Sequence, residues 1–309
     1  MRLDQIYSEQ LDSHPEGHAL YKKLSTLEIK PGSCGFFDHD GDWNPILQLS
    51  DENELKAGGW TLLNGVRIIQ DAGIRWRAKT SKGTTGIRAG ISVTSPALPV
   101  GAGGTVSFKT SSSAGAVLIA DGPIQHHQAQ PSSKFLDWMV QNSSKLISSH
   151  RDAQTYGIWI ITKTYSAKRC ALTVLTSKNA EATISLDVKA SDVGITPSAS
   201  WWNQSSSEAW SIHSDKNGVV MFMSGIYFRP RRFKTTELKA VLERKKQKIW
   251  LGNRGELETI VVEEKTPNGD EYYMELLPEL VGEVEKGGEE KDYEEQAPPG
   301  FHDFEDEDE

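Results

Sequence analysis

Apolar side chains recur at every second position through the middle of the chain, and this period constrains the fold more than any other feature. Around residue 76, Ile74, Trp76 and Ala78 alternate with basic residues, and a second alternating run covers residues 184–189. Successive side chains of a strand point to opposite faces, so each run predicts a strand with one apolar and one wet face. We therefore expect an α+β protein built on a twisted, mainly antiparallel sheet with a few helices.

Three consecutive strands are expected at residues 155–166, 168–177 and 180–190. All three are longer than an ordinary strand and match the length of a strand that crosses a membrane. The other expected strands are short: residues 87–94, the region around Val106 and Phe108, residues 116–120, and a hairpin of residues 209–213 and 218–228 across the turn residues 214–217.

Two amphipathic helices are predicted. The first is capped by Ser132 or Ser133 and places its apolar residues on one stripe as far as His150. The second covers residues 236–250 and ends in a basic cluster. A further short helix is expected within residues 10–27.

The charge of the chain is divided between a basic body and an acidic C-terminal tail. Residues 251–309 hold 21 acidic and four basic residues, a net charge of −17; the whole chain carries −9, so residues 1–250 carry +8. A basic body favours an anionic partner such as membrane lipid, nucleic acid or its own tail. Within the tail, Asn268-Gly269 predicts a turn between strands at residues 258–264 and 271–277, and disorder is expected from about residue 281.

Composition narrows the class of protein. Cys34 and Cys170 are too few for a disulfide framework, and the first residues have no leader pattern, so we expect a reduced, cytoplasmic protein. No apolar run reaches the roughly 18 residues of a spanning helix. Strands that cross a membrane are shorter and weaker in pattern, and hydropathy leaves them open.

No motif for phosphate binding, nucleophilic catalysis or zinc binding occurs, so we assign no catalytic residue, metal site or cofactor. Residues 38–44 alternate carboxylates as a calcium loop does. However, Trp43 and Leu49 stand where an EF-hand needs glycine and glutamate, and a polar turn is favoured over a metal site.

A histidine pair, a cysteine and the scattered basic residues could each indicate a functional site, but each has a simpler structural explanation. Adjacent side chains on an extended chain point apart, so His126 and His127 are expected in a loop rather than in a ligand pair. Cys170 follows Lys168 and Arg169, but a buried strand cysteine is favoured over a reactive thiol. The basic residues are scattered over strands and fit no nucleic-acid module, so no specific nucleic acid is expected.

The texture of one region resembles a known family. It comprises the run Tyr156-Gly157-Ile158-Trp159-Ile160-Ile161-Thr162-Lys163-Thr164-Tyr165, the basic turn Lys168-Arg169, residues 207–211 leading into residues 218–228, and Arg231-Arg232-Phe233. Together these are similar to the second half of a gasdermin pore-forming domain, most closely that of the fungal gasdermin-like cell-death proteins. The resemblance covers residues 27–234 by order of elements and residues 156–233 by residue texture.

The resemblance implies a latent protein that causes lytic cell death. Gasdermins fold as twisted, mainly antiparallel sheets, bind acidic lipids through basic residues, and oligomerise while two hairpin regions extend into a transmembrane β-barrel. A C-terminal segment restrains them until a protease removes it. By position, residues 87–121 and 155–190 would insert, and cleavage would fall within residues 233–254 or 266–270. The protein would be cytoplasmic when latent and would form a homo-oligomer at the plasma membrane when active.

Two departures from the family change where lipid contact is expected, because residues 1–16 are acidic and the tail is short. The residues expected to contact lipid are Arg75, Arg77, Lys79, Lys168, Arg169, Arg231, Arg232, Arg244, Lys245, Lys246 and Lys248. The residues expected to insert are Val106, Phe108, Val117, Ile119, Trp159, Ile161, Leu172, Val174, Ile184 and Leu186.

The resulting division is a pore-forming body (residues 1–234), a basic helix and linker (235–255), an inhibitory hairpin (256–280) and a disordered acidic tail (281–309). An ordinary soluble sheet with one exposed face predicts the same alternation. A soluble β-sandwich that binds a sugar or a protein partner, with a solubilising tail, therefore remains the main alternative, followed by an enzyme without a known motif.

Overall fold

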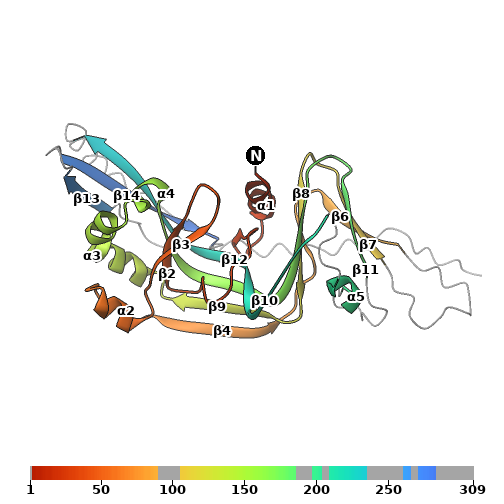
Figure 1. Ribbon diagram of the computed structural model, residues 1–309, viewed down its shortest axis with the longest axis horizontal. Coiled ribbons are helices and arrows are strands. Elements are labelled where there is room, and N and C mark those ends of the chain that lie inside the picture. The colour runs from red at the N-terminus through yellow and green to blue at the C-terminus, as the bar shows by residue number, and fades with distance from the viewer. Residues whose placement is uncertain are drawn as a thin grey trace, which may run out of the picture.

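A computed structural model describes residues 2–89, 105–185, 197–203, 209–234, 260–265 and 271–282. The protein is α+β, with a large antiparallel sheet at one end of its long axis and a three-stranded sheet at the other (Figure 1). The described helices are α1 (Leu3–Leu11), α2 (Glu52–Ala57), α3 (Ser133–Ser149), α4 (Ala153–Tyr156) and α5 (Ala199–Asn203).

The large sheet contains β1 (His18–Ala19), β2 (Ser33–Phe37), β3 (Trp43–Gln48), β4 (Arg67–Ile74), β5 (Lys79–Thr80), β8 (Gly115–Asp121), β9 (Ile124–Gln130), β10 (Ile158–Leu175), β12 (Ser211–Lys234), β13 (Ile260–Lys265) and β14 (Glu271–Val281). The small sheet has the order β11-β7-β6, with β6 (Thr84–Ala89), β7 (Thr105–Thr110) and β11 (Glu181–Ser185).

Strand β10 is the centre of the large sheet. One of its edges pairs with β12, from Ile158–Phe228 to Leu172–Ser211, and the other edge pairs in turn with β2, β9 and β8. The two long strands approach closely at Gly225, where an added Cβ would lie 2.4 Å from the carbonyl oxygen of Ile160. Glycine is required there because any side chain would collide with the neighbouring backbone.

The main core lies between the large sheet and α3. One stripe of this helix, including Phe135, Met139 and Leu146, is fully buried, as its amphipathic pattern predicts. The same cluster contains buried residues of β13 and β14, such as Val262 and Leu276. The C-terminal hairpin therefore contributes to the main core.

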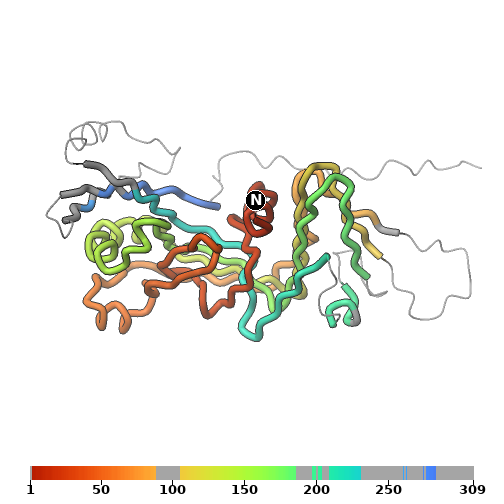
Figure 2. The backbone as a smooth tube through the Cα atoms, turned by 45° about the horizontal axis from the view of Figure 1, so that its top comes forward, coloured from red at the N-terminus to blue at the C-terminus, as the bar shows by residue number. Residues whose placement is uncertain are grey.

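The turn predicted at Asn268-Gly269 joins two strands that pair antiparallel, from Lys265–Glu271 to Ile260–Leu276. Beyond this prediction, β14 also pairs with β12 through ten residue pairs, from Gly225–Val281 to Lys234–Tyr272. Figure 2 shows the hairpin continuing the large sheet at the end of the molecule that carries α3. This part of the acidic tail docks as structure.

Three expectations about local structure were wrong. The first helix is α1, Leu3–Leu11, and lies before most of residues 10–27, because Pro15 and Gly17 interrupt a helix there. Residues 155–156 belong to α4, and the first two expected long strands are the single strand β10, whose exposed Lys168 marks a register shift rather than a turn. The expected hairpin at residues 214–217 is an excursion within β12: residues 215–218 lie between the pairs Arg169–Ser214 and Ala167–Val219.

Some expectations lie outside the described residues. These include the helix at residues 236–250, with Arg244, Lys245, Lys246 and Lys248, as well as Leu186 and the acidic end from residue 283. None of the described helices is long and apolar enough to cross a lipid bilayer.

Candidate functional site

The candidate site is the bend between the two sheets, where three strand runs turn over: β4–β5–β6, β8–β7 and β10–β11. The first two runs form the first long hairpin, and β10–β11 with β12 form the second. Strand β10 ends its pairing with β8 at Leu175–Gly115, and β11 begins its pairing with β7 at Glu181–Lys109. Between these pairs the β10–β11 run advances by six residues, and the β8–β7 run goes back by six. The backbones of Thr110 and Ala180 bridge the interval with a hydrogen bond of 3.3 Å. The register of this strand pair is thus unchanged across the bend.

The outer strand of the first hairpin follows the same course. Strand β4 pairs with β9 from Arg67–Gln130, β5 pairs with β8 at Lys79–Leu118, and β6 pairs with β7 as far as Ala89–Thr105. Residues 67–89 and 105–130 are therefore the two arms of one antiparallel hairpin, interrupted by a bulge near Gly73 and by the bend. The pairs Thr80–Val117 and Thr84–Thr110 flank the bend. Between them the β7–β8 arm is three residues longer than the β5–β6 arm, and these extra residues allow the hairpin to bend.

The small sheet is amphipathic. In β7, Val106 and Phe108 are buried at 1% exposure, whereas Ser107 and Lys109 face outwards or lie at the surface. Strand β11 repeats this alternation, with Ile184 on its buried face. The buried face packs against Val117, Ile119, Ala171 and Leu175 of the large sheet.

Three tryptophans close this second core. The ring of Trp210 lies 6.0 Å from Phe108 and 5.6 Å from Trp201, and its Nε1 donates a 3.1 Å hydrogen bond to the carbonyl of Thr183. The Trp202 ring lies 5.1 Å from that of Trp201, and its buried Nε1 has no hydrogen-bond partner among the described residues. The alternating pattern of the strands does not include Trp201 and Trp202. Three tryptophans within ten residues were the signal that could have identified this cover.

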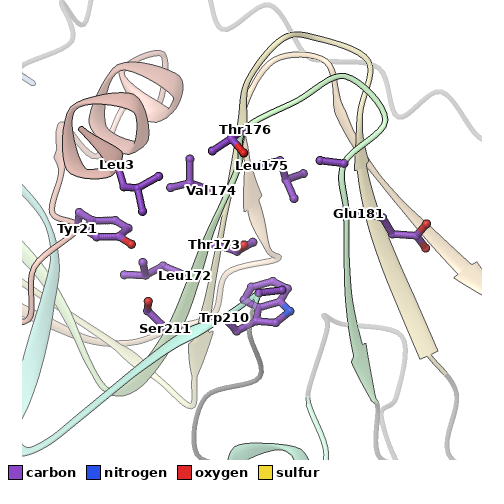
Figure 3. Close-up of a pocket in the computed structure, with 12 residues that line it drawn as sticks. Leu3, Tyr21, Leu172, Thr173, Val174, Leu175, Thr176, Glu181, Trp210 and Ser211 are labelled. Carbon is purple, nitrogen blue, oxygen red and sulfur yellow. The ribbon is translucent and has the colours of Figure 1, made fainter. Parts of the chain in front are cut away.

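An open cavity of about 510 Å³ lies on the inner side of the bend (Figure 3). Its wall includes residues 172–176, where β10 approaches the turn to β11, and Leu3 and Tyr21 face it from the N-terminal segment. Trp210 lines the opposite side.

The structure gathers half of the residues expected to insert. Val106, Phe108, Val117, Ile119 and Ile184 share the tryptophan-covered core. Leu172 is buried and Val174 half-buried in the neighbouring core beneath α1, while Ile161 and the half-buried Trp159 lie in a separate cluster. Insertion of any of these side chains remains a prediction, since all the described ones but Trp159 and Val174 are buried.

The residues expected to contact lipid differ in availability. Arg75, Arg77 and Lys168 are exposed. Arg169 forms an ion pair with Asp121, at 2.7 Å from Nε to the carboxylate, and its guanidinium lies 5.0 Å from the Trp202 ring. The backbones of Arg231 and Arg232 lie in β12 opposite β14.

Arg75, Arg77 and Lys79 were expected on one solvent-exposed face, and for Lys79 this expectation is wrong. Its Nζ lies 2.5 Å from Oε1 of Glu16, and the lysine and glutamate side chains are only 19% and 10% exposed. The other carboxylate oxygen of Glu16 is buried, and no residue in the described part of the chain forms a hydrogen bond with it. The N-terminal segment thus covers Lys79 through an ion pair. The alternation of residues along the strand does not predict this contact.

The same N-terminal segment carries two histidines whose pKa values are lowered by burial. For His14, the carbonyl of Thr80 at 3.0 Å from Nε2 partly opposes this effect, and for His18 the charge of Asp12 does so. Because the folded pKa values lie below the ordinary value of about 6.5, the unfolded chain binds protons more tightly. Stability is present above that pH and is lost as the pH falls through the lowered pKa values.

We therefore expect the midpoint of urea unfolding to fall between pH 7.5 and pH 5.5, and His18→Gln to make this decline shallower. His39→Gln is the control, because that side chain is 74% exposed. An unchanged pH dependence in His18→Gln would contradict the assignment.

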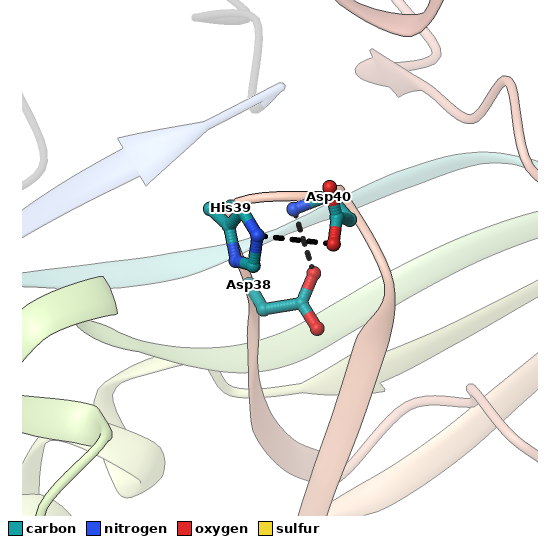
Figure 4. Close-up of side chains that lie close together, drawn as sticks. All are labelled: Asp38, His39 and Asp40. Carbon is teal, nitrogen blue, oxygen red and sulfur yellow. Dashed lines mark hydrogen bonds and ion pairs between the residues drawn. The ribbon is translucent and has the colours of Figure 1, made fainter.

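Residues 38–42, the first part of the run that resembles a calcium loop, form a polar turn between β2 and β3 (Figure 4). The carboxylate of Asp38 accepts hydrogen bonds from the backbone of Asp40 and Asp42 and from the Asn44 side chain, and these bonds lower its pKa, that from Asp42 most. Although Asp38, His39 and Asp40 lie close together, the latter two are exposed, and these hydrogen bonds account for the turn.

The remaining candidates follow the simpler explanations. Cys170 is buried, and burial raises the pKa of its thiol to about 12, as expected for an unreactive strand cysteine. The expected loop at His126 and His127 is wrong, because both residues lie in β9. His126 stacks on Tyr165 at 4.6 Å and lies 3.1 Å from Asp71.

Comparison with known proteins assigns no family. No family model matches the chain, and no curated protein matches its sequence.

Proposed function

We propose that the protein is a latent membrane-permeabilising protein, gasdermin-like in its action. Its body binds anionic lipid, its two long hairpins straighten at the bend, and their distal halves insert into the bilayer within a homo-oligomer. The C-terminal tail restrains the protein until a protease acts on it. The observation that carries this proposal is the unchanged register of β10–β11 and β8–β7 across the bend.

Register matters because of the backbone. In lipid, an unpaired N–H or C=O group costs several kcal/mol, so inserting strands must keep their partners. Two neighbouring strands that already keep one register on both sides of a bend can straighten without exchanging partners. The chain from Thr105 to Asp121 has 17 positions, which exceeds the roughly 9–11 residues of a membrane-spanning strand.

The side chains fit the same requirement. The buried face of the small sheet would meet the acyl chains with Val106, Phe108 and Ile184, and the opposite face would meet water with Ser107 and Thr183. In the closed form the tryptophans and the large sheet cover the apolar face. A soluble β-sandwich would also contain such a face, and dye release from vesicles distinguishes it from a membrane-permeabilising protein.

Dye release from vesicles tests the proposal. A specific protease site is inserted into residues 251–255 of the full chain, and the chain is added to vesicles with and without acidic lipid, before and after cleavage. We expect release only after cleavage and mainly from acidic vesicles. If the cut chain releases dye from neither kind of vesicle, the soluble binding module is the better account. Equal release before and after cleavage would remove the inhibitory role of the tail.

Lipid contact can be tested at Lys168. A basic residue near an anionic surface contributes about 1 kcal/mol, so Lys168→Glu should weaken vesicle binding by about 2 kcal/mol, or about thirtyfold. Co-sedimentation with acidic vesicles measures this change. The matched control is Lys56→Glu on α2, where an exposed lysine pairs with Glu52 at 2.9 Å. Equal losses in both variants would indicate a general charge effect without a lipid-binding surface at Lys168.

A further inference from the structure

The two long hairpins form one four-stranded antiparallel unit whose outer strands are β4 and β12. Strand β4 pairs with β9, β9 with β10, and β10 with β12, each time antiparallel. Among the described residues, β9 is the only partner of β4, so the other edge of β4 carries no strand. Residues 70–73 of β4 are all exposed.

The outer edge of β12 is occupied. Strand β1 pairs with it at Phe222 and Met223, and the tail strand β14 pairs with it from Gly225 to Lys234. An ion pair of 2.9 Å between Arg229 and Glu279 lies on this seam, and Arg231 pairs with Glu275 in the ladder. At Arg229 and Glu279 a basic residue of β12 is thus matched to an acidic residue of the tail.

The direction of the tail strand is informative. Because β14 is antiparallel to β12, it runs in the same direction as β4 of the same molecule. A neighbouring copy placed head to tail in the same sheet would bring its β4 to the β12 edge in that direction too. Four alternating strands per copy preserve the antiparallel order from one copy to the next. Such heterologous contacts generate a ring when the rotation between copies closes, and an open filament when it does not.

We propose that β12 is the edge at which the next copy of this chain adds its β4, and that β14 keeps the protein latent by occupying that edge as a strand. This proposal deepens the proposed function and rests on it. It commits to a second copy, because β4 and β12 are the two edges of one repeating unit and their directions are complementary. Restraint then depends on strand occupancy in addition to the charge of the tail.

The seam also includes a close contact that locates the end of β14. An added Cβ at Gly282 would lie 2.4 Å from the Cα of Gly17, and the Ser224 hydroxyl lies 3.0 Å from the Gly282 carbonyl and 3.2 Å from that of Glu16. The tail and the N-terminal segment therefore meet at the β12 edge. Loss of β14 would uncover ten consecutive positions of that edge.

A disulfide lock tests the proposal in the full chain that carries the inserted protease site. Arg229→Cys and Leu277→Cys stand directly opposite in the β12–β14 ladder, a position that permits a disulfide between strands. The control Glu263→Cys with Tyr273→Cys joins β13 to β14 and leaves the hairpin untied from β12. The native Cys34 and Cys170 are buried and do not compete.

The cut chain is examined oxidised and reduced, by mass photometry in detergent and by dye release. We expect the locked variant to remain monomeric until it is reduced, and the control variant to assemble in both states. Assembly with the lock intact, or a monomer after the reduced tail has been released, would overturn the proposal. Assembly without dye release would keep the edge assignment and refute the proposed permeabilising function.

A second arm identifies the partner edge. One population carries Gln70→Cys on β4, another carries Arg229→Cys on β12, and a short bis-maleimide is added to cut, assembled protein. Cross-links in the mixed population, and none in either population alone, are expected. Cross-links between two Gln70→Cys chains, or none in the mixture, would show that β4 does not meet β12.

Discussion

Trp210→Ala is expected to loosen the small sheet and to accelerate dye release by the cut chain. The substitution removes the ring contacts with Phe108 and Trp201 and the hydrogen bond to the Thr183 carbonyl. Loss of a buried tryptophan typically costs about 3–5 kcal/mol. If the closed state of the small sheet opposes insertion, destabilising it lowers the barrier to opening.

The matched control is Trp60→Ala in the main body, where the ring contacts Trp138 at 6.0 Å and lies beneath Lys145. Urea unfolding measures the stability of both variants, and hydrogen exchange locates the loosened region. We expect both variants to lose stability and only Trp210→Ala to release dye faster. Equal acceleration by both would indicate that general instability, and not the cover over the small sheet, controls release.

The period of the apolar residues predicted several strands and their faces, because alternation is a local property. The strand expected around Trp76 was wrong, because residues 75–78 lie between β4 and β5 outside any strand. Val106, Phe108 and Ile184 were each assigned to an apolar strand face, and each is buried. The bend was beyond such an analysis. In isolation, Ser111 to Ser113 suggest a loop. Only their place opposite residues 177–179 in an unbroken register shows that two neighbouring strands fold over together.

Long-range pairing explains the other failures. Strand β10 continues through Lys168 because β8 and β12 hold it on both sides, whereas a single sequence shows only two polar residues between apolar runs. The ion pair of Glu16 with Lys79 joins residues 63 positions apart. The tail was predicted to contain a hairpin from its turn residues, but its position beside β12 depends on which sheet edge remains open.

Position also changes what the charge division means. Exposed ion pairs such as Arg229–Glu279 contribute at most about 1 kcal/mol and weaken in salt. Met274 and Leu276, in contrast, are fully buried in the main core. Apolar burial and strand pairing therefore account for most of the attachment of the hairpin, and moderate salt should not detach it.

Leu276→Asp is accordingly expected to release the hairpin without cleavage. A carboxylate at this position would be buried without a partner in the core beneath α3. Such a change typically lowers the free energy of unfolding by about 4 kcal/mol. The uncut chain should then self-associate and release dye from acidic vesicles. Hydrogen exchange across residues 271–281 measures undocking, and mass photometry in detergent measures association.

Leu277→Asp provides the control, because the adjacent side chain faces the other side of β14 and is only half-buried. The two variants have the same composition and net charge, so a purely electrostatic tail predicts the same behaviour for both. A tail that acts by holding the β12 edge predicts activation by Leu276→Asp alone. If Leu276→Asp undocks the hairpin and the uncut chain remains monomeric and inactive, occupancy of that edge is not what keeps the protein latent.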